Sequence, residues 1–262
     1  MAIDYSSPGP LTDLSRVDPS VLHRVPDDPV EICGLAQSLI VHPFETEPLG
    51  LPEKRFADNQ LRPAEAIVGA LLSLRPDPVH VPRDPHERVV GTCRHFALLT
   101  TALLRHRGIE ARARCGFATY FQEGKGVDHW VVELRQNGGW TRFDPQIVKQ
   151  DLTPEQFLSG GEAWVAHRAG RIDAMKFGVG GTDNWGPAEI RGNAIRDLAA
   201  LNKVEMLPWD EWGRMEASYR GETGADYDDL MDVIAETCAA DDPEEVAGLY
   251  RSEDLEVPKA LL

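Results

Sequence analysis

Hydrophobic residues recur every three to four positions in two segments of the N-terminal part, a pattern that predicts amphipathic helices. The first segment covers 29–41 and begins at Pro29, directly after the capping acid Asp28. The second covers 62–75 and ends at a proline-rich turn, where a helix cannot continue. The stretch between them, 42–59, contains three prolines and predicts a long loop. We therefore expect two N-terminal helices joined by an irregular segment.

The pattern changes from helical to alternating in the middle of the chain. A helical run begins at Cys93 and ends near Gly108, a residue suited to closing a helix. Three segments with strand character follow, at 111–121, 129–135 and 140–143, and the last two flank Asn137-Gly138-Gly139, a strong hairpin signal. One helix followed by three antiparallel strands predicts an α+β core.

The C-terminal part is mainly helical in pattern. We expect helices at about 154–159, 162–168, 187–203, 208–214, 230–238 and 243–250. The glycine-rich segment 178–186 follows no convincing strand and lacks the Lys-Ser/Thr ending of a phosphate-binding loop, so a nucleotide site is not favoured. With no repeat or linker visible, the sequence predicts a single domain over 1–262. It consists of a catalytic core at 60–150 and a helical extension at 151–262 that covers the core or its cleft.

The charge balance narrows the classes of partner. The 262-residue chain has 27 basic and 43 acidic residues and a formal charge of −16. This surface repels phosphate, so neither nucleic acid nor an anionic membrane is an expected partner. No apolar run approaches the roughly 20 residues that span a bilayer, and the first ten residues lack the features of a secretory signal. We expect a cytoplasmic protein whose oligomeric state is open.

Three side chains in the middle of the chain are of the types used in nucleophilic catalysis. Cys93 opens a helix, His129 opens a strand and Asp144 closes the next, with separations of 36 and 15 positions. The thiolate is the reactive form of cysteine, and a helix N-terminus or a neighbouring imidazolium favours it. A carboxylate can fix the tautomer and orientation of the imidazole. The trio therefore fits a catalytic triad, with the backbone N–H of Cys93 as an oxyanion donor.

Two other interpretations of these residues were weighed. The chain has four cysteines, at 33, 93, 115 and 238, with no C-x-x-C spacing, and a lone cysteine is most often a small buried residue. A zinc site could use Cys93, His95, His129 and Asp144. However, Cys93 and His95 point in different directions on a helix because they are two positions apart. We therefore expect no metal and no cofactor.

The flanking residues resemble those of a known family. The segments G-x-C-x-x-F-A, L-L-R-x-x-G-I-x-A-R, D-H-W-V-V-E and G-W-x-x-F-D-P occur in this order over roughly 60–150 and are similar to the transglutaminase-like superfamily of papain-like cysteine enzymes. The resemblance implies a Cys-His-Asp triad at Cys93, His129 and Asp144. It also matches Arg112 or Arg114 to a structural arginine, and Trp140 to the tryptophan before the aspartate.

The resemblance also implies a reaction class. Members of the superfamily form an acyl-enzyme on amide or peptide substrates, and the acyl group is then hydrolysed or transferred to an amine. We expect a small molecule or a short peptide as substrate. The alternative is a non-catalytic scaffold or binding module, because related members that have lost the cysteine serve as scaffolds, although this chain keeps all three residues.

Further candidates surround this trio. The resemblance implies a second oxyanion donor upstream of the cysteine helix, for which Asn59 and Gln60 are candidates. The more ordinary interpretation of Asn59 is a helix cap. Substrate-binding candidates are Trp130, Trp185, Arg191 and Arg196. The two tryptophans can exclude water from a site or pack in the core. The two arginines can bind a carboxylate, or form an internal ion pair with Glu189 or Asp197.

Overall fold

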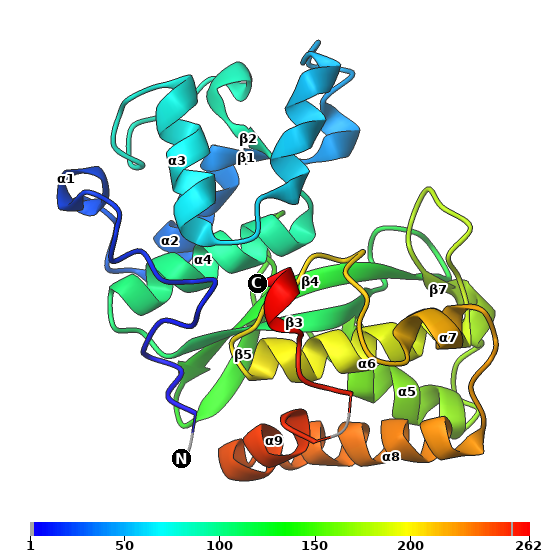
Figure 1. Ribbon diagram of the computed structural model, residues 1–262. Helices are drawn as coiled ribbons and strands as arrows, with labels where there is room; N and C mark the ends of the chain where they lie inside the picture. The colour runs from blue at the N-terminus through cyan, green and yellow to red at the C-terminus, as the bar shows by residue number, and fades with distance from the viewer. Residues whose placement is uncertain (1–2, 253) are drawn as a thin grey trace. The chain divides into compact units, whose positions relative to one another are not determined.

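The computed structural model describes residues 3–252 and 254–262, which fall into two compact units (Figure 1). The N-terminal unit comprises 4–113 and 131–151. The C-terminal unit comprises residue 3, 114–130 and the described residues from 152 onward. The predicted core, 60–150, contributes to both units, because two strands of its sheet run from one unit into the other. The assignment of a single domain to 1–262 stays a prediction.

The helices and strands have the following bounds. The α-helices are α1 (Pro19–Leu22), α2 (Pro29–Leu39), α3 (Ala64–Leu74), α4 (Cys93–His106), α5 (Gly160–Arg168), α6 (Pro187–Leu201), α7 (Met215–Tyr219), α8 (Ala225–Ala240) and α9 (Pro243–Tyr250). The strands are β1 (Ile40–Val41), β2 (Val89–Val90), β3 (Ala111–Ala118), β4 (Gly126–Gln136), β5 (Gly139–Phe143), β6 (Phe157–Ser159) and β7 (Phe177–Gly178). Short 3-10 helices are η1 (Pro43–Glu45), η2 (Glu53–Gln60), η3 (Pro85–Glu87), η4 (Ala174–Lys176) and η5 (Lys259–Leu261).

The helix α2 begins where its capping signal predicts. The side chain of Asp28 accepts hydrogen bonds from the backbone N–H groups of Val30 and Glu31, and Pro29 occupies the first turn. The helix ends before Ile40, two residues earlier than predicted. Ile40 and Val41 form β1 instead and pair in parallel with Val89 and Val90 of β2. This long-range pairing satisfies their backbone groups outside the helix.

The central helix α4 lies in the N-terminal unit and is buried along almost its whole length. Its last turn is followed by Gly108, whose φ of 71° is the left-handed conformation that ends helices. Arg105, also buried, donates to the carbonyl of Ala111 at 3.0 Å and to the hydroxyl of Thr12 at 2.9 Å. The helix is therefore tied to the N-terminal segment and to the start of β3.

The strands β4 and β5 form the predicted hairpin. Their register pairs Val132 with Phe143 and Gln136 with Gly139. The turn residues Asn137 and Gly138 both have positive φ, at 50° and 79°, as a type I′ turn requires. The sheet has the order β5-β4-β3-β6, and β7 adds to β4 in parallel. Helices combined with a largely antiparallel sheet confirm the α+β class.

The C-terminal unit is mainly helical, as predicted. Helix α5 packs against α6 and α8, and Figure 1 shows the three side by side. The buried Trp164 on α5 donates its indole N–H to Asp232 of α8 at 2.7 Å. The predicted helix at 154–159 is wrong, because Phe157–Ser159 form β6 and pair with Gly116–Ala118 of β3. The predicted helix at 208–214 is also wrong, since those residues form turns.

Helix α6 holds β3 in the C-terminal unit through a buried ion pair. Arg114 donates two hydrogen bonds to Asp197, at 2.9 and 2.7 Å. The backbone N–H of Cys115 donates to the same carboxylate at 3.0 Å. A bidentate arrangement of this kind fixes orientation as well as charge. Arg114 is therefore a structural arginine in this chain.

Arg112, in the N-terminal unit, also pairs with a buried carboxylate. It donates to Glu133 at 2.7 Å and lies 4.0 Å from the ring centre of Trp140. Both predicted structural arginines are thus buried and paired.

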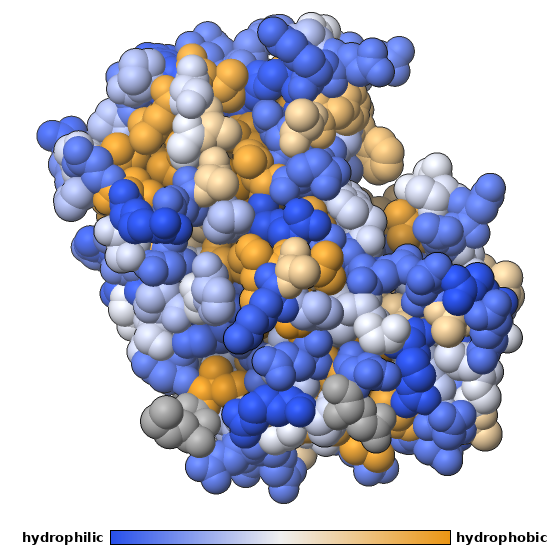
Figure 2. Space-filling model, viewed as in Figure 1, coloured by the Kyte–Doolittle hydropathy of each residue, from blue (hydrophilic) through white to orange (hydrophobic). Residues whose placement is uncertain are grey.

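Hydrophilic side chains cover most of the face shown in Figure 2, with smaller apolar patches between them, as the acidic composition leads one to expect. Within the described residues, every helix is too short or too polar to cross a bilayer. The cytoplasmic location stays a prediction.

Candidate active site

Cys93 is the first residue of α4 and belongs to the N-terminal unit. Thr92 precedes it as the N-cap, and the Thr92 N–H donates to Nδ1 of His95 at 3.1 Å. A Cβ on Gly91 would lie 2.7 Å from the Cβ of His95, so this position has no room for a larger residue. Cys93 is 6% exposed. The local sequence therefore fixes the thiol at a helix N-terminus, as predicted.

His95 contributes to this turn as a neutral side chain. It is completely buried on α4, and burial, reinforced by the charge of Arg94, lowers the pKa of His95 to about 3. The backbone of Asn59 and Leu61 lies against the His95 ring. A neutral imidazole that accepts at Nδ1 serves as part of the helix cap, so its first role is structural.

Asp144 also belongs to the N-terminal unit, directly after β5, and is completely buried. One carboxylate oxygen accepts from the backbone N–H of Gln146 at 2.8 Å. Its backbone pairs with Lys149 in both directions, at 2.8 and 3.0 Å. Burial, followed by the negative charge of Asp144, raises the pKa of the Cys33 thiol. The Asp144 carboxylate is thus held by the turn that follows the hairpin.

His129 lies on β4 in the C-terminal unit and is 2% exposed. Its ring contacts two aromatic rings of the same unit. The Phe121 ring centre lies 4.9 Å away at an interplanar angle of 62°, and the Tyr120 ring centre lies 6.2 Å away at 82°. Both are edge-to-face contacts. No local pattern predicts these two neighbours, because their approach depends on the path of the loop after β3.

Asp128, the residue before His129, is held by helix α6. The side-chain N–H₂ of Asn193 donates to Asp128 at 2.8 Å and to the carbonyl of Gly116 at 3.2 Å. Burial raises the pKa of Asp128, while the charge of Arg196 opposes this effect. Burial also raises the pKa of Glu189 to about 6. Burial thus disfavours ionisation of both carboxyl groups, and the positive charge of Arg196 opposes this effect on each.

Arg191 and Arg196 are engaged in internal ion pairs. Arg196 is buried and binds Glu189 at 3.3 Å, which is one of the two pairs considered from the sequence. Arg191 binds Asp228 on α8 at 2.7 Å. Both guanidinium groups therefore have carboxylate partners within the C-terminal unit, and their role in binding a substrate carboxylate stays a prediction.

The two candidate tryptophans differ in exposure. Trp130 is completely buried, so it is a core residue in this structure. Trp185 is half-buried, donates its indole N–H to the carbonyl of Thr182 at 2.9 Å, and lies 4.7 Å from the ammonium group of Lys125. Trp185 is therefore the more accessible of the two, and substrate contact by either tryptophan stays a prediction.

Asn59 and Gln60 close the 3-10 helix η2 in the N-terminal unit. The N-cap of α3 is Pro63, so the expectation that Asn59 caps that helix is wrong. The amide oxygen of Asn59 is buried and has no hydrogen-bond partner, whereas Gln60 is exposed. Because the Asn59 backbone lies against His95, Asn59 is the better placed of the two candidates near the first turn of α4.

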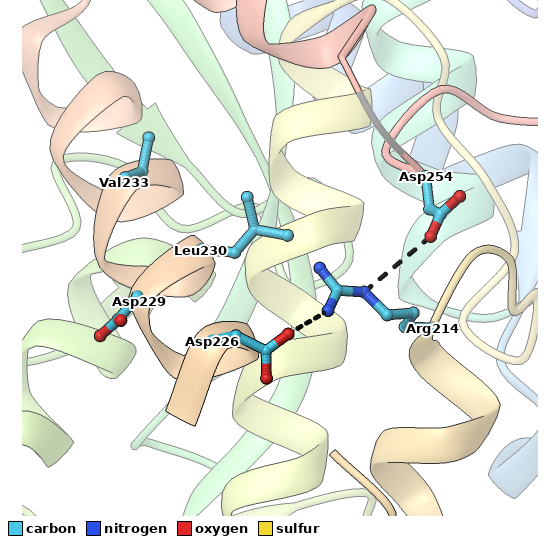
Figure 3. A pocket seen from close by; sticks show the side chains of 6 residues that line it. All are labelled: Arg214, Asp226, Asp229, Leu230, Val233 and Asp254. Carbon is cyan, nitrogen blue, oxygen red and sulfur yellow. Dashed lines mark hydrogen bonds and ion pairs between the residues drawn. The ribbon is translucent and has the colours of Figure 1, made fainter. Parts of the chain in front are cut away.

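A separate pocket of about 680 Å³ lies in the C-terminal unit (Figure 3). Its lining residues are Arg214, Asp226, Asp229, Leu230, Val233 and Asp254. Arg214 binds Asp226 at 2.8 Å and lies 3.9 Å from Asp254, as the dashed lines in Figure 3 show. The lining contains neither a thiol nor an imidazole, so we assign no part of the triad chemistry to it.

Comparison with known proteins supports the resemblance drawn from the sequence. Residues 73–145 match the model of the transglutaminase-like superfamily, so this part of the chain is similar to members of that superfamily. The match includes all three predicted triad residues and points to cysteine-based catalysis. No curated protein sequence matches the chain significantly.

One solved structure matches part of the chain. It is described as a putative cysteine protease from Cytophaga hutchinsonii and is 17% identical, with a TM-score of 0.35. The alignment covers 58% of this chain and 46% of that chain, so this chain corresponds to less than half of that protein. A likeness at this level supports no conclusion on activity.

Proposed function

We propose that this chain is a thiol enzyme that forms an acyl-enzyme on an amide, peptide or related acyl substrate. Cys93 would be the nucleophile, His129 the general base and acid, and Asp144 the group that orients the imidazole. The observation that carries the proposal is the register of the β4–β5 hairpin. The match of residues 73–145 to the transglutaminase-like superfamily supports it.

The register relates the histidine and the aspartate through one continuous strand. Strand β4 runs from Gly126 to Gln136, and Val132 pairs with Phe143 of β5. Asp144 directly follows Phe143, the last residue of β5. His129 precedes Val132 by three positions along β4. Along the chain, both residues thus lie toward the end of the hairpin opposite its turn.

The position of Cys93 at a helix N-terminus provides the other two requirements, a reactive thiol and an oxyanion donor. The first N–H groups of a helix lack intrahelical partners, and the helix dipole favours negative charge beside them. Reactive cysteines are commonly found at such a helix N-terminus. The Cys93 N–H can also donate to the oxyanion that forms on the substrate, which is the kind of interaction that contributes most to acyl transfer. We propose the Asn59 amide group as the second donor.

In the proposed reaction the Cys93 thiolate attacks the acyl carbonyl carbon, and the carbonyl electron pair moves to oxygen. The His129 imidazolium, which holds the former thiol proton, protonates the leaving nitrogen as the carbon–nitrogen bond breaks. Water or a second amine then attacks the thioester while His129 accepts its proton. The carbon–sulfur bond breaks, the thiol is restored, and an acid or a new amide leaves. Hydrolysis and transfer differ only in this second nucleophile.

Substitution of Cys93 tests the proposal, and Cys238 offers a matched control because both cysteines are 6% exposed. The Cys93→Ala variant should lose turnover of an activated ester such as p-nitrophenyl acetate. It should also lose alkylation by low concentrations of iodoacetamide, measured by intact mass. The Cys238→Ala variant should retain both. Full activity of Cys93→Ala would overturn the proposal, and a wild-type protein inert to both reagents would favour the scaffold alternative.

A further inference from the structure

The loop between β3 and β4 is fixed at both ends within the C-terminal unit. At its start, the Thr119 N–H donates to the carbonyl of Gln156 at 3.0 Å, and the Thr119 hydroxyl donates to the carbonyl of Glu155 at 2.7 Å. At its end, Gly126 pairs with Phe177 of β7, and the preceding Lys125 N–H donates to the carbonyl of Gln122 at 3.2 Å. Gly124 completes this turn with a φ of 72°, which favours glycine. The residues between these anchors therefore have a defined path.

A second loop packs against the first. The Lys125 ammonium lies 4.7 Å from the ring centre of Trp185, a cation–π contact. The approach of Gly180 to Gln122 is also close, because a Cβ at 180 would lie 3.5 Å from the Gln122 side-chain nitrogen. Trp185 in turn closes its own loop through the hydrogen bond to Thr182 at 2.9 Å. The two loops support each other within the C-terminal unit.

This supported loop presents an apolar ring beside the imidazole. Phe121 is 39% exposed although its ring centre lies only 4.9 Å from that of His129. Tyr120 packs against Phe121 with 4.7 Å between ring centres. A loop anchored at both ends, which holds an exposed phenyl ring against a buried imidazole, leaves apolar surface uncovered at that point. Covering such a ring with an apolar group of a ligand is favourable.

We infer that Phe121, backed by Tyr120, forms an apolar subsite beside His129 that selects substrates with an aromatic or bulky apolar group near the acyl carbonyl. The inference rests on the proposed function, because His129 marks the position of the reacting carbonyl. Phe121 is a specificity-determining residue in this assignment: it contacts the substrate and takes no part in proton transfer.

Two esters with the same leaving group test the subsite. We compare p-nitrophenyl acetate with p-nitrophenyl 3-phenylpropionate, each corrected for its uncatalysed hydrolysis. An apolar subsite discriminates by about 10- to 200-fold for a group of modest size. The wild type should therefore favour the phenylpropionyl ester in kcat/KM by about tenfold or more. Phe121→Ala should reduce this ratio to about 2 or less, whereas Phe121→Leu should keep most of it because leucine retains apolar volume.

Trp209 provides the matched control. It belongs to the same unit and is also aromatic. Its exposed fraction of 43% is similar to the 39% of Phe121. The Trp209→Ala variant should keep the wild-type ratio. Thermal unfolding of each variant shows whether it folds, and the Leu variant keeps the test valid if the Ala variant is unstable. A Cys93-dependent esterase whose ratio is near 1, or is unaffected by Phe121→Ala, overturns the subsite and leaves the proposed function intact.

A labelling experiment separates the two hypotheses further, because it needs only a reactive thiol. Alkylation rates of Cys93 are measured with iodoacetamide and with N-benzyl-iodoacetamide in the wild type and in Phe121→Ala. The benzyl reagent should gain about tenfold over iodoacetamide in the wild type, and lose this advantage in the variant. If Cys93 reacts with neither reagent, the proposed function fails and the subsite fails with it. Equal relative rates in both proteins overturn the subsite alone.

Discussion

Asn193 on α6 donates a 2.8 Å hydrogen bond to Asp128, the residue that precedes His129 on β4. The same amide group donates to the carbonyl of Gly116 on β3 at 3.2 Å. A side chain from the helical C-terminal part thus fixes two neighbouring strands beside the proposed general base. Asn193 acts through the backbone that carries the imidazole, so we assign it a positioning role.

The Asn193→Ala variant should lower both stability and turnover. It leaves the Asp128 carboxyl group without its amide donor in a buried setting, which costs about 1–3 kcal/mol. Urea denaturation measures the stability. The kinetic effect should fall on kcat more than on KM for p-nitrophenyl acetate, because the substrate-binding groups are unchanged. Asn202→Ala, at the C-cap of the same helix, is the control and should leave turnover at the wild-type level. Equal kinetics of the two variants would refute the positioning role.

Asn59 should matter for the transition state more than for substrate binding. Loss of one oxyanion donor typically reduces kcat by about 10²–10³-fold, and we expect this range for Asn59→Ala with little change in KM. Gln60→Ala should change kcat less than twofold, because that side chain is exposed. Steady-state kinetics on one ester decide the matter. Loss of activity in the Gln60 variant alone would transfer the role to that residue.

His95 should contribute measurably to the pH dependence of folding stability. Its folded pKa is about 3, against an unfolded value near 6.5. Between these values the unfolded chain binds a proton that the folded chain does not, so stability falls as the pH falls from about 6.5 toward 3. His95→Gln should reduce this loss of stability on acidification, because it removes the titrating imidazole. Glutamine can still accept the capping hydrogen bond, so the helix start is retained. Urea midpoints at pH 7 and pH 4.5 measure the difference.

His106 is the control for this experiment, because it lies on the same helix but is exposed. His106→Gln should keep the wild-type dependence on pH. If His95→Gln and the wild type lose the same stability on acidification, His95 does not account for the effect.

The tight approach at Gly91 should make even one methyl group costly. A Cβ there would lie 2.7 Å from the Cβ of His95, and overpacking of this kind costs about 1–3 kcal/mol. Gly91→Ala should therefore lower the urea midpoint and slow alkylation of Cys93. Gly69→Ala is the opposite case, since a Cβ at that exposed position of α3 meets nothing within 4 Å. It should raise stability by about 0.5–1 kcal/mol because alanine favours a helix. A stable Gly91→Ala protein would show that the helix start can shift.

Local signals predicted the elements whose ends are set by nearby residues. Asp28 and Pro29 marked the start of α2, Gly108 the end of α4, and Asn137-Gly138 the hairpin turn, because caps and turns depend on a few consecutive side chains. The helix predicted at 154–159 failed for the opposite reason. Thr153 and Gln156 do form a capping turn, with a hydrogen bond of 3.1 Å, but the next three residues pair with β3, far away in sequence.

The residues of the candidate site likewise fall into those that local sequence predicted and those that depend on contacts between distant segments. Cys93 at a helix start and Asp144 at a strand end followed from local pattern, and the structure places both there. The Glu189–Arg196 pair lies within α6 and was considered from the sequence. The partner of Arg191, in contrast, comes from α8, and the neighbours of His129 come from a loop whose path the pattern does not define. Contacts between distant segments decide which charged side chains are available to a ligand, and single-sequence periodicity contains no information on such contacts.

The polar side chains of α6 limit how far the chain can be truncated from its C-terminal end. Asp197 and Asn193 are the partners of Arg114 on β3 and of Asp128 on β4. An excised fragment ending at 151 would retain the whole family-matching segment but lose α6, and with it the partners of Arg114 and Asp128 and the cover over both strands. The smallest piece of this chain that can be expressed as a stable protein therefore extends through α6, well past the boundary that family similarity suggests.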